Sequence, residues 1–418
     1  MAHSESRLAV KNLYKIFGDD PDGALERLGQ GATKDEVLRD TGCVVGVSDV
    51  SFEVASGEIF VVMGLSGSGK STLIRCINRL ITPTRGEILV GDEDLLAMDT
   101  EQLREVRLER MSMVFQHFAL FPHMTVAENV AFGLKIRGVD PEQRREKALS
   151  SLRLVGLEEW ADSPPANLSG GMQQRVGLAR GLAVDPEILL MDEPFSALDP
   201  LIRRDMQLEL IELQRSIGNS IVFITHDLHE ALILGHRIAI MKDGRFVQMG
   251  TPEEIVVNPA DDYVTEFTRD IDRGRVLRVG SIAERTEPLQ MDRSSPSEAD
   301  NRLQESGRSA ILVVDGNGKP VGMVTRAALS RSPASGSAEL SDVMTRDVPM
   351  ARQSTLLIEA YGKCSKGLPL AVVDDEGRLT GTVTPAAVLS ALASDDAVDE
   401  SESTEEDDNG TRTRVAAG

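Results

Sequence analysis

The segment GLSGSGKS at residues 64–71 constrains the fold of this chain more than any other segment. It fits the pattern G-x-x-x-x-G-K-[S/T], and it lies between the apolar run EIFVVM and the helix-like stretch STLIRCINRL. A loop of this kind joins a buried strand to a helix, so the segment predicts an α/β fold that binds a nucleoside triphosphate.

The chemistry of phosphate binding explains which residue types occur in this loop. Glycines let backbone N–H groups approach phosphate oxygens, and the helix that follows directs its positive end at the same phosphates. Lys70 supplies a charge to the β- and γ-phosphates, and the Ser71 hydroxyl is a ligand for Mg²⁺. The residues predicted to bind ATP in this loop are Gly64, Leu65, Ser66, Gly67, Ser68, Gly69, Lys70, Ser71 and Thr72.

Two more apolar runs read as buried strands, ILLMD at 188–192 and IVFIT at 221–225. With the helical segments between them, they predict a mainly parallel sheet within residues 1–270. MDEP places Asp192 and Glu193 at the carboxyl end of a strand, which is where open α/β sheets bind ligands. Asp192 can hold Mg²⁺ through its water shell, and Glu193 can take a proton from the attacking water. The structural alternative is that these two acids only cap a helix.

Between these motifs, LSGGM followed by QQRV is similar to the signature that distinguishes ABC ATPases from other phosphate-loop proteins. Other sequence elements of that family occur within residues 14–226, in the same order as in the family. They are Phe17, which resembles the aromatic residue that stacks on adenine (Tyr14 is the alternative), Gln116 of the Q-loop, SALD (196–199) of the D-loop and His226 of the H-loop.

The resemblance implies roles for these residues. The catalytic residues would be Glu193, His226, Gln116 and Lys70, and the Mg²⁺ ligands would be Ser71, Gln116 and Asp192. In the family, a second copy completes the site, so Ser169, Gly170, Gly171 and Asp199 would bind the partner's ATP in a head-to-tail homodimer. LSGG opens a helix whose N–H groups can bind an anion, which fits this role. For His226, the expected role is a contact with the γ-phosphate, and the alternative is a packed or capping residue.

The resemblance also implies a helical subdomain at about residues 100–175, inserted into the nucleotide-binding domain. LFPHMTVAENVAFGL (120–134) resembles the part of that subdomain that importers dock against their membrane subunit. A solvated helical insertion is the alternative.

Residues 275–394 contain an internal repeat, because VVDGNGKPVGMVTRAAL (313–329) matches VVDDEGRLTGTVTPAAV (372–388). Each copy predicts a strand, a turn, a second strand and the start of a helix. The repeats resemble a tandem pair of CBS domains, at about 275–333 and 340–394. Such modules often bind adenine nucleotides through an acid soon after the Thr that ends the second strand, but TRAA and TPAA contain no acid. Residues 395–418 read as a disordered acidic tail.

The link at residues 18–43, the C-terminal repeats, and segments such as KNLYKIFG and FSALDPLIRRDMQ look like the ATPase subunits of glycine betaine/proline uptake systems. That resemblance implies a polytopic permease and an extracytoplasmic substrate-binding protein as partners. It implies a location at the cytoplasmic face of the membrane, and regulation by the CBS pair. An importer of another small solute is the alternative, as is a CBS pair that only helps dimerisation.

Charge and composition argue against some classes of function. The chain has 45 lysine and arginine residues and 67 aspartate and glutamate residues. The resulting net charge of −22 argues against binding to nucleic acid. The acidic, lysine-poor composition is typical either of a protein from a salt-rich cytoplasm or of an ordinary acidic bacterial protein. No apolar run is long enough to span a bilayer, and the N-terminal stretch does not read as a secretory signal, so we expect a soluble chain. A soluble ABC ATPase of DNA repair or translation is an alternative, but the sequence shows no long coiled coil, second ATPase unit or basic groove, which that class would need. A regulatory module with a vestigial ATPase would need a lost catalytic residue, yet Lys70, Asp192, Glu193 and His226 are all present.

Overall fold

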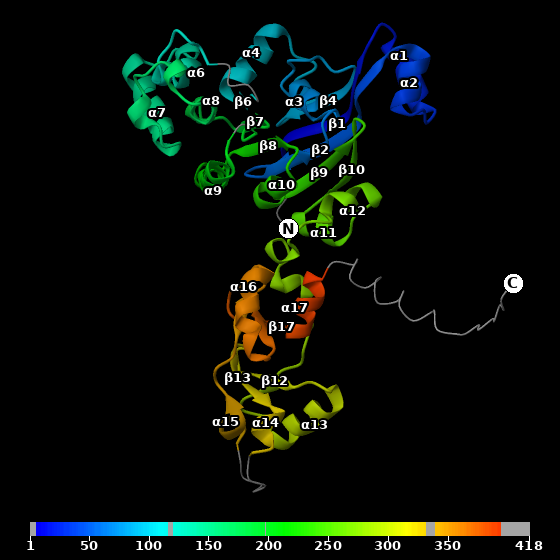
Figure 1. The fold of residues 1–418 in the computed structure, drawn as a ribbon, viewed down its shortest axis with the longest axis vertical. Helices are drawn as coiled ribbons and strands as arrows, with labels where there is room; N and C mark the ends of the chain where they lie inside the picture. The colour runs from blue at the N-terminus through cyan, green and yellow to red at the C-terminus, as the bar shows by residue number, and fades with distance from the viewer. Residues whose placement is uncertain (1–5, 116–119, 197, 332–338, 394–418) are drawn as a thin grey trace, which may run out of the picture. The chain divides into compact units, whose positions relative to one another are not determined.

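The computed structural model describes residues 6–115, 120–196, 198–331 and 339–393. The chain divides into two compact units, Met1–Thr268 and Arg269–Gly418. Each unit is described by itself below, with the labels of Figure 1.

The centre of the first unit is a six-stranded sheet. Its strands are β3 (Ile59–Met63), β6 (Met111–Val114), β7 (Ile188–Asp192), β8 (Ser220–Thr225), β9 (Arg237–Lys242) and β10 (Arg245–Gly250). The order is β10-β9-β3-β8-β7-β6, and all neighbours are parallel except β9 and β10. Every residue of β3, β7 and β8 is buried, which explains why their sequences are continuous apolar runs rather than alternating ones. The three predicted strands are therefore confirmed.

A second sheet of the first unit is antiparallel, with the order β2-β1-β4-β5. Its strands are β1 (Ser6–Phe17), β2 (Val44–Ala55), β4 (Arg85–Val90) and β5 (Glu93–Asp94). Helix α3 (Lys70–Ile77) packs in one apolar cluster with both sheets, because Leu73 and Ile77 share that cluster with Phe60 of β3 and Leu13 of β1. This packing fixes the start of α3, and with it the phosphate loop, against the end of β3.

The link between β1 and β2 forms two helices, α1 (Pro21–Gly29) and α2 (Lys34–Thr41). Ala24, Leu28 and Val37 bury their side chains against Ile16 and Val45 of the two strands. A capping box at Thr33 and Glu36 starts α2. The link is thus a folded part of the first unit, with an apolar cluster of its own.

Four helices of the first unit pack against one another, α5 to α8. They are α5 (Val126–Val130), α6 (Phe132–Ile136), α7 (Pro141–Leu154) and α8 (Gly170–Ala183), with the short turns η1 (Glu158–Trp160) and η2 (Pro165–Asn167). Asn129 is fully buried, and its side chain bonds the backbone of Phe121, Met124 and Thr125. This contact fixes the segment that precedes α5.

The first unit has further helices besides α1 to α3 and α5 to α8. They are α4 (Thr100–Glu109), α9 (Pro200–Ile217), α10 (Leu228–Leu234), α11 (Pro252–Val257) and α12 (Asp262–Thr268). Leu103 and Val106 of α4 join the core cluster of the sheets. Asp99, Asp199 and Asp227 each cap the helix that follows them with their side-chain oxygens.

The second unit holds two similar halves. The first half contains β11 (Leu289–Gln290), β12 (Ala310–Val314), β13 (Pro320–Thr325), β14 (Met344–Thr345), α13 (Pro296–Ser306), α14 (Arg326–Leu329) and α15 (Leu340–Val343). The second half contains β15 (Met350–Arg352), β16 (Leu370–Val373), β17 (Leu379–Val383), α16 (Leu357–Tyr361), α17 (Pro385–Leu392), η3 (Arg273–Arg275), η4 (Val279–Ile282) and η5 (Gly362–Lys366).

The predicted repeat is confirmed, since β12, β13 and α14 recur as β16, β17 and α17. A cluster that contains Leu312 and Met323 of the first half and Ala371 of the second joins the two halves. Thr325 and Thr384 hold equivalent places, because the side chain of each caps the helix that follows.

Candidate active site

The phosphate loop bends tightly between β3 and α3, and glycine is required at two of its positions. A Cβ on Gly64 would lie 2.2 Å from the carbonyl oxygen of Met241, and one on Gly69 would lie 2.3 Å from that of Gly46. Both glycines also have positive φ, at 154° and 108°. The neighbouring backbone therefore presses against the outside of the loop. A loop this close to its supports can present its N–H groups in a fixed arrangement.

Lys70 is buried inside this loop. Its ammonium group donates to the carbonyl oxygens of Gly64 at 2.8 Å and Leu65 at 3.0 Å. Burial lowers the pKa of Lys70, and the nearby carboxylates of Glu193 and Asp192 partly oppose this effect. A cation held by carbonyl dipoles inside a loop of glycines suits the binding of a phosphate anion.

Ser71 and Asp192 form the first pair of side chains beside the loop. The Ser71 hydroxyl donates to Asp192 Oδ1 at 2.9 Å, and Arg75 lies 3.5 Å from Asp192 Oδ2. Asp192 is fully buried at the end of β7, and burial raises the pKa of its carboxyl group. Its Oδ2 atom has no hydrogen-bond partner among the described residues beyond the ion pair with Arg75, whose side chain is 46% exposed, so this buried oxygen has capacity for a second cation. A hydroxyl and a carboxylate side by side fit the oxygen ligands of Mg²⁺.

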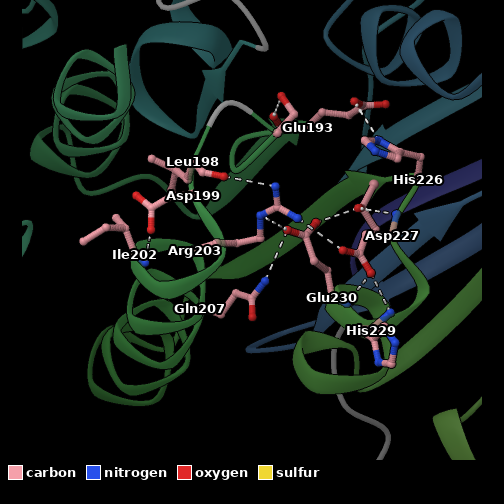
Figure 2. A network of polar contacts seen from close by, with 12 residues as sticks. Glu193, Leu198, Asp199, Ile202, Arg203, Gln207, His226, Asp227, His229 and Glu230 are labelled. Carbon is pink, nitrogen blue, oxygen red and sulfur yellow. Dashed lines mark hydrogen bonds and ion pairs between the residues drawn. The ribbon is translucent and has the colours of Figure 1, made fainter. Parts of the chain in front are cut away.

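Glu193 and His226 form the second pair, at the ends of the neighbouring strands β7 and β8. Glu193 Oε2 lies 3.0 Å from His226 Nδ1, as Figure 2 shows. The side chain of His226 is 58% exposed, and the cap of α10 is Asp227, so His226 neither packs in the core nor caps this helix. The geometry gives Glu193 a polar neighbour at the place where a proton would be taken from water.

A cavity of about 610 Å³ brings most of these residues together. Phe17 lies on its wall, and Lys15 Nζ is 4.8 Å from the centre of the Phe17 ring. Tyr14 instead packs against the apolar cluster beneath α1 and α2. The residues that line the cavity are Phe17, Lys34, Val44, Val45, Gly46, Leu65, Ser66, Gly67, Gly69, Lys70, Ser71, Thr72, Glu193 and His226.

The sequence did not identify Lys34, Val44, Val45 and Gly46 as part of this cavity. Val44 pairs with Phe17 in the antiparallel register of β1 and β2, so recognition of this strand pairing would have placed it. Lys34 begins α2, and no pattern in the sequence indicated that this helix lies beside the cavity.

The residues predicted to act on a partner's nucleotide lie outside that cavity lining. Ser169 caps α8 by accepting the N–H of Met172, and Gly170 and Gly171 form the first turn of that helix. The Asp199 carboxylate accepts the N–H groups of Leu201 and Ile202 at the start of α9. Gln116, predicted as a catalytic residue and a Mg²⁺ ligand, lies outside the described residues, as does the predicted tail at 395–418.

Comparison with known families agrees with this geometry. The family described as ABC transporter matches residues 47–196, and the CBS domain matches residues 292–334 and 340–394. The glycine betaine transport ATP-binding protein OpuAA of Bacillus subtilis is 48% identical over 401 residues, which are 96% of this chain and 96% of that protein.

Two further proteins match a smaller share of this chain. The trimethylamine N-oxide transport system ATP-binding protein TmoW of Ruegeria pomeroyi is 52% identical over 276 residues, 66% of this chain and 81% of that protein. The dimeric post-hydrolysis structure of the ATP-binding cassette MJ0796, bound to ADP and Pi, is 32% identical with a TM-score of 0.51. That match covers 59% of this chain and 98% of the cassette.

Proposed function

This chain belongs to the ATP-binding proteins of ABC transporters, and from this premise we propose that it energises the import of glycine betaine or a related osmoprotectant. ATP hydrolysis that drives transport is the activity of this family. The substrate rests on the relative that matches nearly the whole chain and is described as a glycine betaine transporter subunit. The relative TmoW is described as the ATP-binding protein of a trimethylamine N-oxide transport system, so the proposal extends to small solutes with methylated nitrogen.

The observation that carries the proposal is the placement of two polar pairs over one phosphate loop. Asp192 and Glu193 lie at the carboxyl end of β7 and His226 at that of the adjacent β8, while Ser71, at the start of α3, bonds Asp192, and Lys70 lies within the loop. ATP in the cavity would place its phosphates against the loop, and Phe17 would stack on the base. Ser71, Asp192 and Gln116 would hold Mg²⁺, which when bound supplies positive charge to the phosphate oxygens.

In this proposal, Glu193 takes the proton of the attacking water and His226 keeps the carboxylate in position. Their 3.0 Å contact is short enough for the histidine to donate a hydrogen bond to the carboxylate. Lys70 supports the β- and γ-phosphates while the bond to the γ-phosphate breaks. Leu65, Ser66, Ser68 and Thr72 complete the cradle around these phosphates.

We further propose that two copies of the chain form the complete site. Ser169, Gly170, Gly171 and Asp199 lie away from the Lys70 cavity and would meet the nucleotide of the partner copy. The ADP-bound cassette that this chain resembles is described as a dimer. Within the described residues, no helix is long and apolar enough to cross a bilayer. The proposed membrane partner is a permease that docks on residues 120–134, at the cytoplasmic face, with an extracytoplasmic substrate-binding protein.

The CBS pair is proposed to regulate transport. Thr325 and Thr384 each cap a helix whose first residues carry no acid, so the acid through which such modules often bind adenine nucleotides is missing at both places. Ionic strength acting on charged surfaces is then the favoured signal. A pair that only helps dimerisation is the alternative.

Uptake of labelled glycine betaine tests the substrate directly. Cells that express the permease, with and without this chain, are compared, and trimethylamine N-oxide, choline and proline are added as unlabelled competitors. ATP-driven uptake should disappear without the chain. Unchanged uptake, with ATP hydrolysis by the purified protein intact, would keep the ATPase and reject the substrate.

A further inference from the structure

Arg203, in the first turn of α9, contacts three acceptors in two segments of the first unit, the turn before α9 and the start of α10. Its Nη2 donates to the carbonyl oxygen of Leu198 at 3.1 Å, and its Nη1 lies 3.4 Å from Asp227 Oδ2. Its Nε lies 3.8 Å from Glu230 Oε1. Figure 2 shows the guanidinium between the turn that precedes α9 and the start of α10.

Glu230 is a buried carboxylate in this network. It accepts a hydrogen bond from Thr225 Oγ1 at 2.6 Å and another from Gln207 Nε2 at 3.2 Å. Its side chain is only 6% exposed, and burial raises the pKa of the carboxyl group. Thr225 is the last residue of β8 and directly precedes His226. Glu230 therefore ties α10 to the strand end from which His226 projects.

The other end of the network reaches the surface that we assign to the partner's nucleotide. Leu198 precedes Asp199, and its side chain is buried. A Cβ built on Gly171 would lie 3.0 Å from Leu198 Cδ2, so Leu198 packs directly against the first turn of α8. A shift of the Leu198 backbone would move both Asp199 and this contact.

We propose that Arg203 is a positioning residue for ATP hydrolysis, which holds the Leu198–Asp199 turn and the Thr225–Asp227 turn in one relative geometry. The inference rests on the proposed roles of Glu193 and His226. A guanidinium suits this task because its donors form a planar fork, which an ammonium group cannot reproduce. The alternative is a purely structural role, in which Arg203 only neutralises the buried charge of Glu230.

The test compares the full-length chain with Arg203→Met, Arg203→Lys and the control Arg204→Met. Arg204 is the next residue on α9, is exposed, and has no ion pair in the described part of the chain. Steady-state kcat and KM for ATP, ATP affinity and the thermal unfolding midpoint are measured for each. Arg203→Met and Arg203→Lys should lower kcat by about tenfold or more, since small misplacements of catalytic groups are costly, while ATP affinity changes little. Arg204→Met should match the parent protein.

The double variant Arg203→Met/Glu230→Gln separates positioning from charge neutralisation, and it leaves no buried charge without a partner. We expect it to recover the unfolding midpoint but not kcat. Recovery of kcat in the double variant, or a kcat for Arg203→Lys within twofold of the parent, would overturn the proposal. Glu193→Gln and His226→Ala serve as reference variants. If both keep the parent rate, the assigned site fails, which is distinguishable from a failure at Arg203 alone.

Discussion

Glu193 adopts a backbone conformation that is costly for a residue with a side chain. Its φ is 49°, in the left-handed region, where non-glycine residues cost roughly 1–2 kcal/mol. The N–H of Glu193 donates to the carbonyl oxygen of Ile224 on β8, and the Ser196 hydroxyl donates to the carbonyl oxygen of Glu193. These contacts hold the strained turn, and the turn directs the carboxylate to His226. Strain that is held in this way is typical of functional residues.

The amide variant Glu193→Gln tests the proposed base. It keeps the size and the backbone contacts of the residue but cannot take a proton. We expect hydrolysis to fall by roughly 10²–10⁴-fold, the usual contribution of a general base, while ATP binding persists. Size-exclusion chromatography with ATP should then show a stable dimer. Turnover at the parent rate would remove Glu193 as the base.

Glu230 gives a prediction about stability and pH. Burial raises its pKa in the folded chain above the ordinary value of 4.5, so folding favours the protonated carboxyl. The contribution to stability is complete below the ordinary pKa and is lost as the pH rises through the raised value. We expect Glu230→Gln to remove this loss. Its free energy of unfolding, relative to the parent, should increase with pH above about 4.5 and then level off.

Urea unfolding at a series of pH values measures this difference directly. Subtraction of the two curves cancels the titration of the other acids, which both proteins share. A difference that stays constant from acid to neutral pH would show that the carboxyl of Glu230 is not penalised by burial.

Local motifs made part of the site predictable from the sequence. Gly64, Gly69, Lys70 and Ser71 are neighbours in the chain, so their spacing alone gives the loop and its chemistry. Contacts between distant residues were not predictable in this way. Arg203 reaches Glu230 only because α9 and α10 pack side by side, and no sequence spacing encodes that packing.

At the scale of elements, the buried strands were the most predictable features. A strand that is covered on both faces needs apolar residues at every position, and this continuous pattern stood out in β3, β7 and β8. The helices α1 and α2 were read only as a long link, because they are short and mostly polar. Their stability comes from Ala24, Leu28 and Val37 packing against the strands, which is a tertiary effect.

The start of α9 gives a prediction for Asp199. Its carboxylate accepts two backbone N–H groups there, so Asp199→Ala should lower the free energy of unfolding by about 1 kcal/mol. Asp199→Asn should keep most of the stability, because asparagine caps helices equally well. Urea unfolding of both variants checks this, with the exposed Asp205→Ala of the same helix as control. Equal losses for Asn and Ala would mean that the charge matters more than the cap.

At the scale of the whole molecule, the two units have separate apolar cores. The cluster around Leu73 belongs to the first unit, while the clusters around Leu357 and Leu303 belong to the second. The repeat in the sequence predicted the paired strands of the second unit, because each copy has its own pattern of a strand, a turn and a second strand. No comparable pattern in the sequence indicates a ligand or a signal for this unit.

Truncation after residue 270 tests the role of the second unit. Because the first unit has its own core and the whole phosphate loop, residues 1–270 should fold and hydrolyse ATP with a similar KM. If the CBS pair senses ionic strength, hydrolysis by the full chain should depend more steeply on salt than hydrolysis by the truncated chain, because screening weakens contacts between charged surfaces. A chain that lacks only residues 395–418 separates the effect of the acidic tail. Equal salt dependence, together with weaker dimerisation of the truncated chain, would leave dimerisation as the task of the CBS pair.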